Sequence, residues 1–166
     1  MDISNGEGVG ISLFVQGCHK HCKGCFNQET WDFNGGNIWT SEIENSFIEL
    51  ANKEYIKRIS ILGGEPLSEE NIESVYYLIK KLKEKYPQKQ VWIYTGYTIE
   101  YLYCKHHIDF LNIFHLIDVL IDGEFDIEKQ DLDNNSVVWA GSSNQRIIDC
   151  KQTLAKKEIV LYSKKK

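Results

Sequence analysis

The sequence lacks the features that mark membrane and secreted proteins. No apolar run approaches the roughly 20 residues that a membrane-spanning helix needs. Residues 1–10 contain Asp2 and Glu7 and have no apolar segment of the kind found in signal peptides. Basic residues are also too few for a broad nucleic-acid-binding surface, because 19 Lys and Arg against 24 Asp and Glu give a net charge of −5. We therefore expect no membrane and no nucleic acid among the partners of this protein.

Cysteine is scarce outside one short stretch. The chain has five cysteines, of which Cys18, Cys22 and Cys25 fall close together, while Cys104 and Cys150 stand alone. Disulfide frameworks are typical of secreted chains with an even number of cysteines, so an odd and clustered set indicates a reducing, cytoplasmic location. We expect Cys104 and Cys150 to be ordinary structural or surface thiols.

The clustered cysteines have the spacing C-x₃-C-x₂-C, which is typical of a soft-metal site. A closed site needs four ligands, and this stretch supplies three cysteines. Zinc can take His19 or His21 as the fourth ligand. A 4Fe–4S cubane on three cysteines keeps one iron open for a ligand that is not protein. The spacing favours a cluster, and it leaves a zinc knuckle and a disulfide pair as alternatives.

Apolar runs that end in turns predict strands, and periodic apolar stripes between them predict helices. The predicted strands span residues 11–16, 59–62, 91–95 and 118–121, with a further short strand over 158–162. Two predicted helices begin at Ser41, where Glu44 completes a capping box, and at Ser68. Two shorter helices are predicted over 99–105 and 109–114.

Strands that alternate with helices predict an α/β fold with a mainly parallel sheet, in one domain over residues 1–166. A complete (β/α)₈ barrel needs about 250 residues, so this chain is long enough only for a partial, open barrel. Ligands of such folds bind at the carboxyl ends of the strands. One edge of the sheet is therefore expected to gather the cysteine stretch, Gly63-Gly64-Glu65, Thr95-Gly96, Asp122-Gly123 and Gly141-Ser142.

Several motifs, in this order along the chain, are similar to those of one enzyme family. They are Asn5-Gly6-Glu7-Gly8, Phe14-Val15-Gln16-Gly17-Cys18, the cysteine motif with Phe26-Asn27, Gly63-Gly64-Glu65-Pro66, Thr95-Gly96-Tyr97, Val119 to Gly123 and Gly141-Ser142-Ser143-Asn144-Gln145. The cysteine motif and Gly-Gly-Glu-Pro resemble those of radical S-adenosylmethionine (SAM) enzymes. The whole set resembles the activating proteins of anaerobic ribonucleoside-triphosphate reductase. That family often has Pro where this chain has Glu7, and Arg where it has Gly10.

The resemblance implies a partial barrel of the radical SAM type and two cofactors, a 4Fe–4S cluster and SAM. The cluster is expected on Cys18, Cys22 and Cys25, with SAM on the open iron. One electron from the reduced cluster then cleaves SAM to a 5′-deoxyadenosyl radical. This radical installs a glycyl radical on the large catalytic subunit of anaerobic ribonucleoside-triphosphate reductase. An electron donor such as flavodoxin is a further expected partner.

The candidate cofactor-binding residues lie in and beside these motifs: Gly24, Cys25, Phe26, Gly63, Gly64, Glu65, Thr95 and Asp122. Glycine allows close backbone approach to SAM, Glu65 adds charge, and Phe26 can stack on the adenine. On this reasoning Gly64→Val weakens SAM binding and leaves the iron content near normal. No catalytic residue beyond the cluster and SAM ligands is expected.

Three other functions are compatible with parts of the pattern. They are an activase of another glycyl-radical enzyme such as formate-lyase, a small-molecule radical SAM enzyme such as a carboxy-deazaguanine synthase, and a zinc-binding interaction module without catalysis. The short chain and the Gly141 to Gln145 element favour the reductase. Because 166 residues leave little for lids, we also expect a lateral opening beside the cluster that admits a peptide loop.

Overall fold

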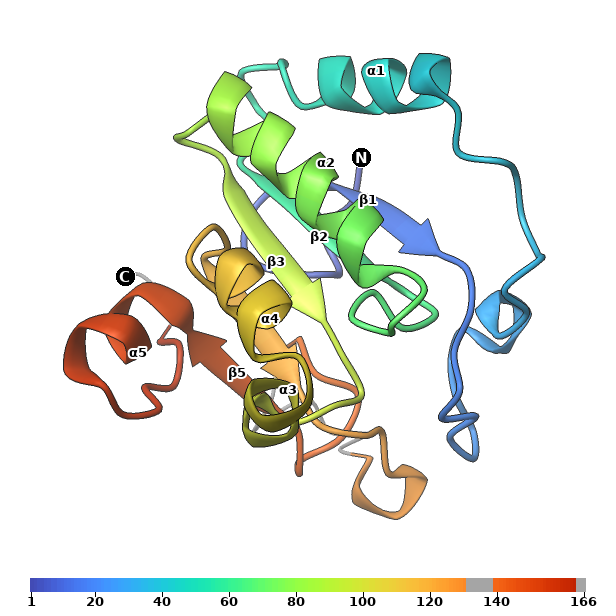
Figure 1. Cartoon of the computed structure of the whole chain (residues 1–166), viewed down its shortest axis with the longest axis vertical. Coiled ribbons are helices and arrows are strands. Elements are labelled where there is room, and N and C mark those ends of the chain that lie inside the picture. Colours follow the sequence, from blue (N-terminus) through green and yellow to red (C-terminus); the bar gives the residue numbers. More distant parts are fainter. Residues whose placement is uncertain (131–138, 164–166) are drawn as a thin grey trace.

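A five-stranded sheet forms the centre of the computed structural model, which describes residues 1–130 and 139–163. The strands are β1 (Gly10–Val15), β2 (Arg58–Gly63), β3 (Gln90–Tyr94), β4 (Val119–Asp122) and β5 (Arg146–Asp149). Their order in the sheet is the same as their order in the chain (Figure 1). β1 to β4 are parallel, and β5 pairs with β4 in the antiparallel sense. The predicted α/β fold with a mainly parallel sheet is therefore confirmed, and the sheet is not closed.

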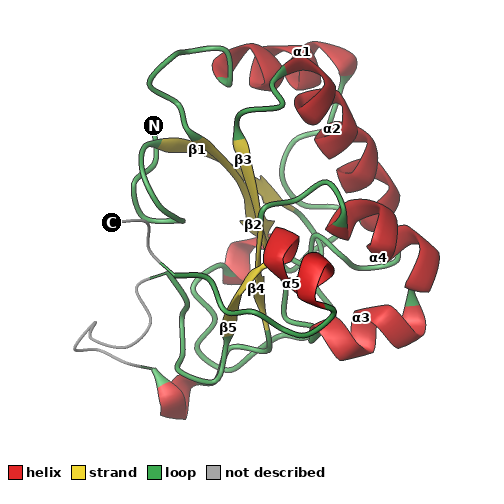
Figure 2. Ribbon diagram, turned by 90° about the vertical axis from the view of Figure 1, so that its left-hand side faces the viewer, coloured by secondary structure: helices red, strands yellow, loops and turns green. Residues whose placement is uncertain are grey.

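Helices cover one face of the sheet. These are α1 (Ser41–Leu50), α2 (Ile72–Lys85), α3 (Ile99–Lys105) and α4 (His107–Phe114), which lie on the same side in Figure 2. The sheet alternates between its two faces, as strand geometry requires. Ile59 and Ile61 of β2 and Ile93 of β3 are fully buried in the main core with these helices. Leu62 and Tyr94 line a cavity instead. No helix in the described part of the chain is both long and apolar enough to cross a membrane.

The N-terminal segment covers part of the other face. Arg58 of β2 is fully buried there, where its guanidinium donates to the carboxylate of Asp2 and to the Asn5 carbonyl. Gly10 is the register partner of Arg58, and a Cβ built on Gly10 meets the Arg58 Cζ at 2.8 Å. The absence of a side chain at Gly10 therefore makes room for this buried cation.

Four details of the predicted elements differ. α1 is capped by Thr40, not Ser41, because the Thr40 hydroxyl accepts the Ile43 N–H. α2 begins after Asn71, and Ser68 lies in the preceding turn. β5 and α5 (Cys150–Lys156) were not predicted. The predicted strand over 158–162 is wrong, since only an isolated bridge between Leu161 and Ile148 forms there.

Candidate functional site

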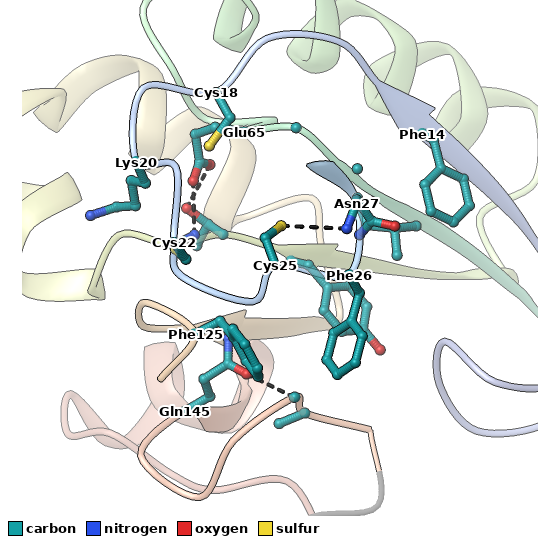
Figure 3. A pocket seen from close by; sticks show the side chains of 18 of the residues that line it. Phe14, Cys18, Lys20, Cys22, Cys25, Phe26, Asn27, Glu65, Phe125 and Gln145 are labelled. Atoms are coloured by element: carbon teal, nitrogen blue, oxygen red, sulfur yellow. Dashed lines mark hydrogen bonds between the residues drawn. The ribbon is translucent and has the colours of Figure 1, made fainter. Parts of the chain in front are cut away.

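A cavity of about 360 Å³ lies at the carboxyl ends of the strands. Its walls come from the loops after β1, β2, β3 and β4 and from the turn before β5, as expected for this type of sheet. Figure 3 shows the cysteine loop along one side of this space, with Phe125 and Gln145 from the later loops facing it. Most of the residues that the sequence singled out therefore meet in one place.

Cys18, Cys22 and Cys25, hereafter the cavity cysteines, all line this cavity and carry free thiols. The Sγ of Cys25 accepts a hydrogen bond from the Asn27 N–H at 3.4 Å (Figure 3). Burial raises the pKa of Cys18 and raises that of Cys22 to about 11. Without a metal these two thiols stay protonated at neutral pH, and metal coordination is what deprotonates such groups. The cavity wall therefore carries three soft sulfur donors.

The loop that carries the cavity cysteines is held by the chain that follows it. The Gly17 N–H donates to the Thr30 carbonyl at 2.8 Å, and the Cys18 N–H donates to the Trp31 carbonyl at 3.0 Å. Gly17 has a φ of +93°, and a Cβ there would lie 1.9 Å from the Phe33 ring. Gly17 is therefore required twice, by its backbone conformation and by the ring packed against it.

The two histidines of the loop are engaged elsewhere. His19 Nε2 lies 2.7 Å from the Glu70 carboxylate, and the His21 ring stacks on Trp31 at 4.5 Å. Among residues 1–130 and 139–163, no three His, Cys, Asp or Glu side chains are gathered around a point that suits a single metal ion. A zinc site with His19 or His21 as fourth ligand therefore finds no support in the geometry. A cubane of four irons and four sulfides takes each thiolate on a separate iron, and the cavity cysteines supply three free thiols to one cavity.

Gly64 lies directly against the start of the cysteine loop. A Cβ on Gly64 would be 2.4 Å from the Gly17 carbonyl oxygen, which is backbone and has no side-chain freedom to yield. The neighbouring Glu65 N–H donates to that same carbonyl at 2.7 Å. The Gly64 carbonyl itself accepts no hydrogen bond from any described residue, and Gly64 lines the cavity. Gly64 is partly exposed, and a backbone carbonyl without a protein donor can accept from the ammonium group of an amino-acid ligand.

Glu65 has a different geometry from the one expected for a ligand-binding charge. Its carboxylate is buried and accepts from the Thr95 hydroxyl at 2.7 Å and from the Gly96 N–H at 2.8 Å. The Leu67 N–H donates to it as well, at 3.0 Å. Burial raises the pKa of Glu65, while these donors and the Lys20 charge act against that rise. Glu65 and Thr95 therefore tie the end of β2 to the end of β3 and shape the cavity wall.

Gly24 and Asp122 do not line this cavity, unlike the other candidate cofactor-binding residues. Gly24 has a φ of +75°, and a Cβ there would meet the Ile127 side chain at 2.4 Å. The fully buried Asp122 accepts from Arg146 Nε at 2.9 Å and from the Ile99 N–H at 2.8 Å. Asp122 is therefore buried outside the cavity, although the next residue, Gly123, lines it.

Sequence reasoning missed several residues of the cavity. Lys20 is the only basic side chain among the described residues that line it, and its ammonium lies 3.2 Å from the Glu124 carboxylate and 4.7 Å from the centre of the Tyr97 ring. Asn5, Phe14 and Tyr94 also line it. Phe14 and Tyr94 lie near the carboxyl ends of predicted strands, and this position was the indication in the sequence that they could line the cavity. The segment Asn5-Gly6-Glu7-Gly8 belonged to the family resemblance, but nothing in it indicated that Asn5 lines the cavity.

Comparisons with known proteins agree with this site. Residues 4–148 match the family described as a 4Fe-4S single cluster domain. The anaerobic ribonucleoside-triphosphate reductase-activating protein of Escherichia coli K12 is 39% identical over 147 residues, which cover 87% of this chain and 91% of that protein. The chain belongs to this family of activating proteins. The same-named proteins of Vibrio cholerae and of phage T4 are 38% and 34% identical over 149 and 146 residues, covering 89% and 88% of this chain and 92% and 87% of theirs.

The family match spans the cavity cysteines and every strand that builds the cavity wall except the last residue of β5. No solved structure gives a significant match to the chain. The description of the matching family and the named relatives fit a 4Fe–4S cluster and SAM as cofactors, and the matched residues include the cavity cysteines and Gly64.

Proposed function

We propose that this protein installs a glycyl radical on anaerobic ribonucleoside-triphosphate reductase, with a 4Fe–4S cluster and SAM as its cofactors. The observation that carries the proposal is that the cavity cysteines and Gly64, whose carbonyl has no donor among the described residues, line the same cavity. Membership of the reductase-activating family supplies the substrate, since the relatives are named for that role. The single domain over residues 1–166 is a partial barrel of the radical SAM type in this proposal.

Each part of the cavity has its task. The cavity cysteines would hold the cluster, the Gly64 carbonyl would accept a hydrogen bond from the SAM ammonium, and Phe26 would stack on the adenine. When bound, the cluster and SAM supply one-electron cleavage of the sulfonium and with it a 5′-deoxyadenosyl radical. Glu65 and Thr95 keep the wall rigid through their buried hydrogen bonds. Their contribution is therefore to position the backbone that meets SAM.

The substrate is a folded protein, so the cavity must be open on one side. Phe14 and Phe26 line the cavity and are nevertheless 45% and 63% exposed. Phe14 belongs to β1, which is the edge strand of the sheet. This open side supports entry of a peptide segment next to the cluster, and exposed aromatic side chains suit a protein partner.

The proposal includes a one-electron donor such as flavodoxin, which reduces the cluster between turnovers. It also places the protein in the cytoplasm, because free thiols and an iron–sulfur centre persist best where the surroundings are reducing.

The test is anaerobic incubation of the iron-loaded protein with SAM, a reductant and the purified reductase. Electron paramagnetic resonance is expected to show a glycyl radical on the reductase. Cys22→Ala is the matched control, because it removes one cluster ligand and leaves the rest of the cavity intact. A fully iron-loaded protein that cleaves SAM and yet forms no radical on the reductase refutes the proposal.

A further inference from the structure

β1 is an edge strand, and part of its outer edge has no partner. Gly10 exchanges two backbone hydrogen bonds of 2.8 Å with the N-terminal segment on that side. The Val15 carbonyl faces the other way and accepts from the Gly64 N–H at 2.8 Å. Because backbone groups alternate in direction along a strand, those of Ser12 and Phe14 point to the outer side, as those of Gly10 do. No described residue forms a hydrogen bond with these backbone groups on that side.

This unpaired stretch is a gap between two covered ends. Asp2 pairs with Gly10 before the gap, and after it the Gly17 N–H donates to the Thr30 carbonyl at 2.8 Å. Residues 11–16 lie between these two pairs and form about 20 Å of extended chain. The gap therefore has room for one short strand beside β1.

The gap is accessible from solvent. Ile11 is buried, whereas residues 12–16 are all at least partly exposed, and Phe14 is 45% exposed. The neighbouring strand β2 is buried from Arg58 to Leu62, so the exposure belongs to the edge and not to the sheet as a whole. The outer edge of β1 can therefore meet another chain.

The edge also lacks the residues that normally protect such a strand. Residues 9–18 contain no Asp, Glu, Lys, Arg or Pro. Native proteins usually block exposed edges with charge, proline or a covering segment, because an unpaired edge recruits further strands. An apolar edge without this protection is typical of a place where an extended partner segment binds.

The gap adjoins the cofactor cavity along its length. Phe14 lines the cavity from within the gap, Ser4 and Asn5 line it next to the end covered by Asp2, and Trp31 lines it next to the other end. A strand added to β1 would run about 4.8 Å from it. Such a strand would therefore lie along the open side of the cavity that contains the cysteines.

We propose that the glycine-bearing segment of the reductase adds to this edge as an extended strand, with its main chain hydrogen-bonded to the N–H and C=O groups of Ser12 and Phe14. The proposal rests on the function proposed above. Glycine has no side chain to be gripped, so a site that selects it must bind the backbone around it, and strand addition does this. A second copy of the chain on this edge would cover the side of the cavity that the substrate needs.

The test is hydrogen exchange of the full-length, anaerobically iron-loaded protein, resolved to single residues by mass spectrometry. In the free protein the Ser12 and Phe14 amides should exchange fast, while those of Leu13 and Val15, which face β2, should exchange slowly. With the catalytic subunit at about ten times its Kd, exchange at Ser12 and Phe14 should slow about tenfold. A catalytic subunit from which the glycine-bearing segment has been deleted is the control and should give no slowing.

Three results would overturn the proposal. The first is fast exchange at Ser12 and Phe14 in a complex that forms the glycyl radical. The second is slowing that persists with the deleted catalytic subunit, which assigns the edge to another part of the reductase. The third is slow exchange in the activating protein alone that increases with its concentration, which assigns the edge to a second copy. A complex that protects the edge and yet never forms the radical refutes the proposed function instead.

A pair of variants tests the same contact by kinetics. Phe14→Pro and Phe14→Ala both remove the ring, but only the proline removes the outward N–H, which the ladder with β2 does not use. Iron content and SAM affinity should be equal in the two variants. The KM for the catalytic subunit should be about fivefold higher in Phe14→Pro, as expected for one lost hydrogen bond. Equal KM values in two folded variants contradict the proposal, and if Phe14→Pro does not fold, hydrogen exchange of the wild type decides.

Discussion

Gly64→Ala is the substitution whose effect the structure predicts most directly. The new Cβ would lie 2.4 Å from the Gly17 carbonyl oxygen, about 1 Å closer than ordinary contact allows. Backbone on both sides must therefore separate, which costs about 1–3 kcal/mol as overpacking. The Glu65 N–H bond to the same carbonyl weakens as well, at a further cost of about 1 kcal/mol. We expect the free energy of unfolding to fall by about 2–4 kcal/mol.

The contact between Gly64 and Gly17 changes the expectation drawn from the sequence, which was that a substitution at Gly64 leaves the iron content near normal. Gly17 precedes Cys18, so displacing it moves a cluster ligand, and iron content should fall together with SAM affinity. The assays are denaturant unfolding of the metal-free protein and iron per chain after anaerobic reconstitution. Gly8→Ala is the control, because its φ of +75° also disfavours a side chain while its nearest neighbour, Lys57, is 3.8 Å away. Gly8→Ala should keep its iron. Normal iron and unchanged stability in Gly64→Ala would refute the reasoning.

Three further predictions concern the ligands and the ion pairs. Alanine at any one of the cavity cysteines should abolish stable iron binding, whereas Cys104→Ala, at an exposed thiol, should bind iron normally; iron assays after reconstitution decide this. Arg146→Ala should lower the free energy of unfolding by about 3 kcal/mol, because it leaves the buried Asp122 carboxylate without its cation; equal denaturation midpoints would contradict this. Hydrogen bonds from Arg146 hold the pKa of Glu100 at about 2. The stability that they add is therefore present above pH 4.5 and is lost as the pH falls toward 2. Acid titration of the free energy of unfolding should not find this loss in Arg146→Ala.

The parallel strands could be predicted because their signal is local. β2 and β3 are runs of β-branched and aromatic residues that end in glycine-bearing turns, and a buried parallel strand requires such runs. β5 has only Ile147 and Ile148 between Arg146 and Asp149, so its pairing with β4 decides its structure, and no periodicity reveals that. The same holds for the predicted strand over 158–162, whose apolar residues find only one bridge.

The site was predictable to the extent that it consists of chemically distinctive residues at short spacing. The three cysteines met that condition, and so did Gly63 and Gly64 at the end of β2. The hydrogen-bond partners of Asp122 and Glu65 could not be predicted in this way. Arg146 and Gly96 are distant from them in the sequence, and only the fold brings them together. Lys20 lies among the cysteines, and in the sequence it looks like an ordinary solvent-exposed loop lysine. Only the fold places Glu124 and Tyr97 beside it.

The sequential strand order has a consequence for how the protein matures. Each strand pairs with the strand that precedes it in the chain, so the sheet can grow in the order of synthesis with short loop closures at each step. The cysteines emerge before β2, yet the wall around them includes residues from the loops that follow β2, β3 and β4, up to Gln145. Iron loading into a finished cavity must therefore wait until nearly the whole chain has folded. Thiols that are exposed in the meantime are open to oxidation, so we expect iron loading of the newly made chain to require the absence of oxygen.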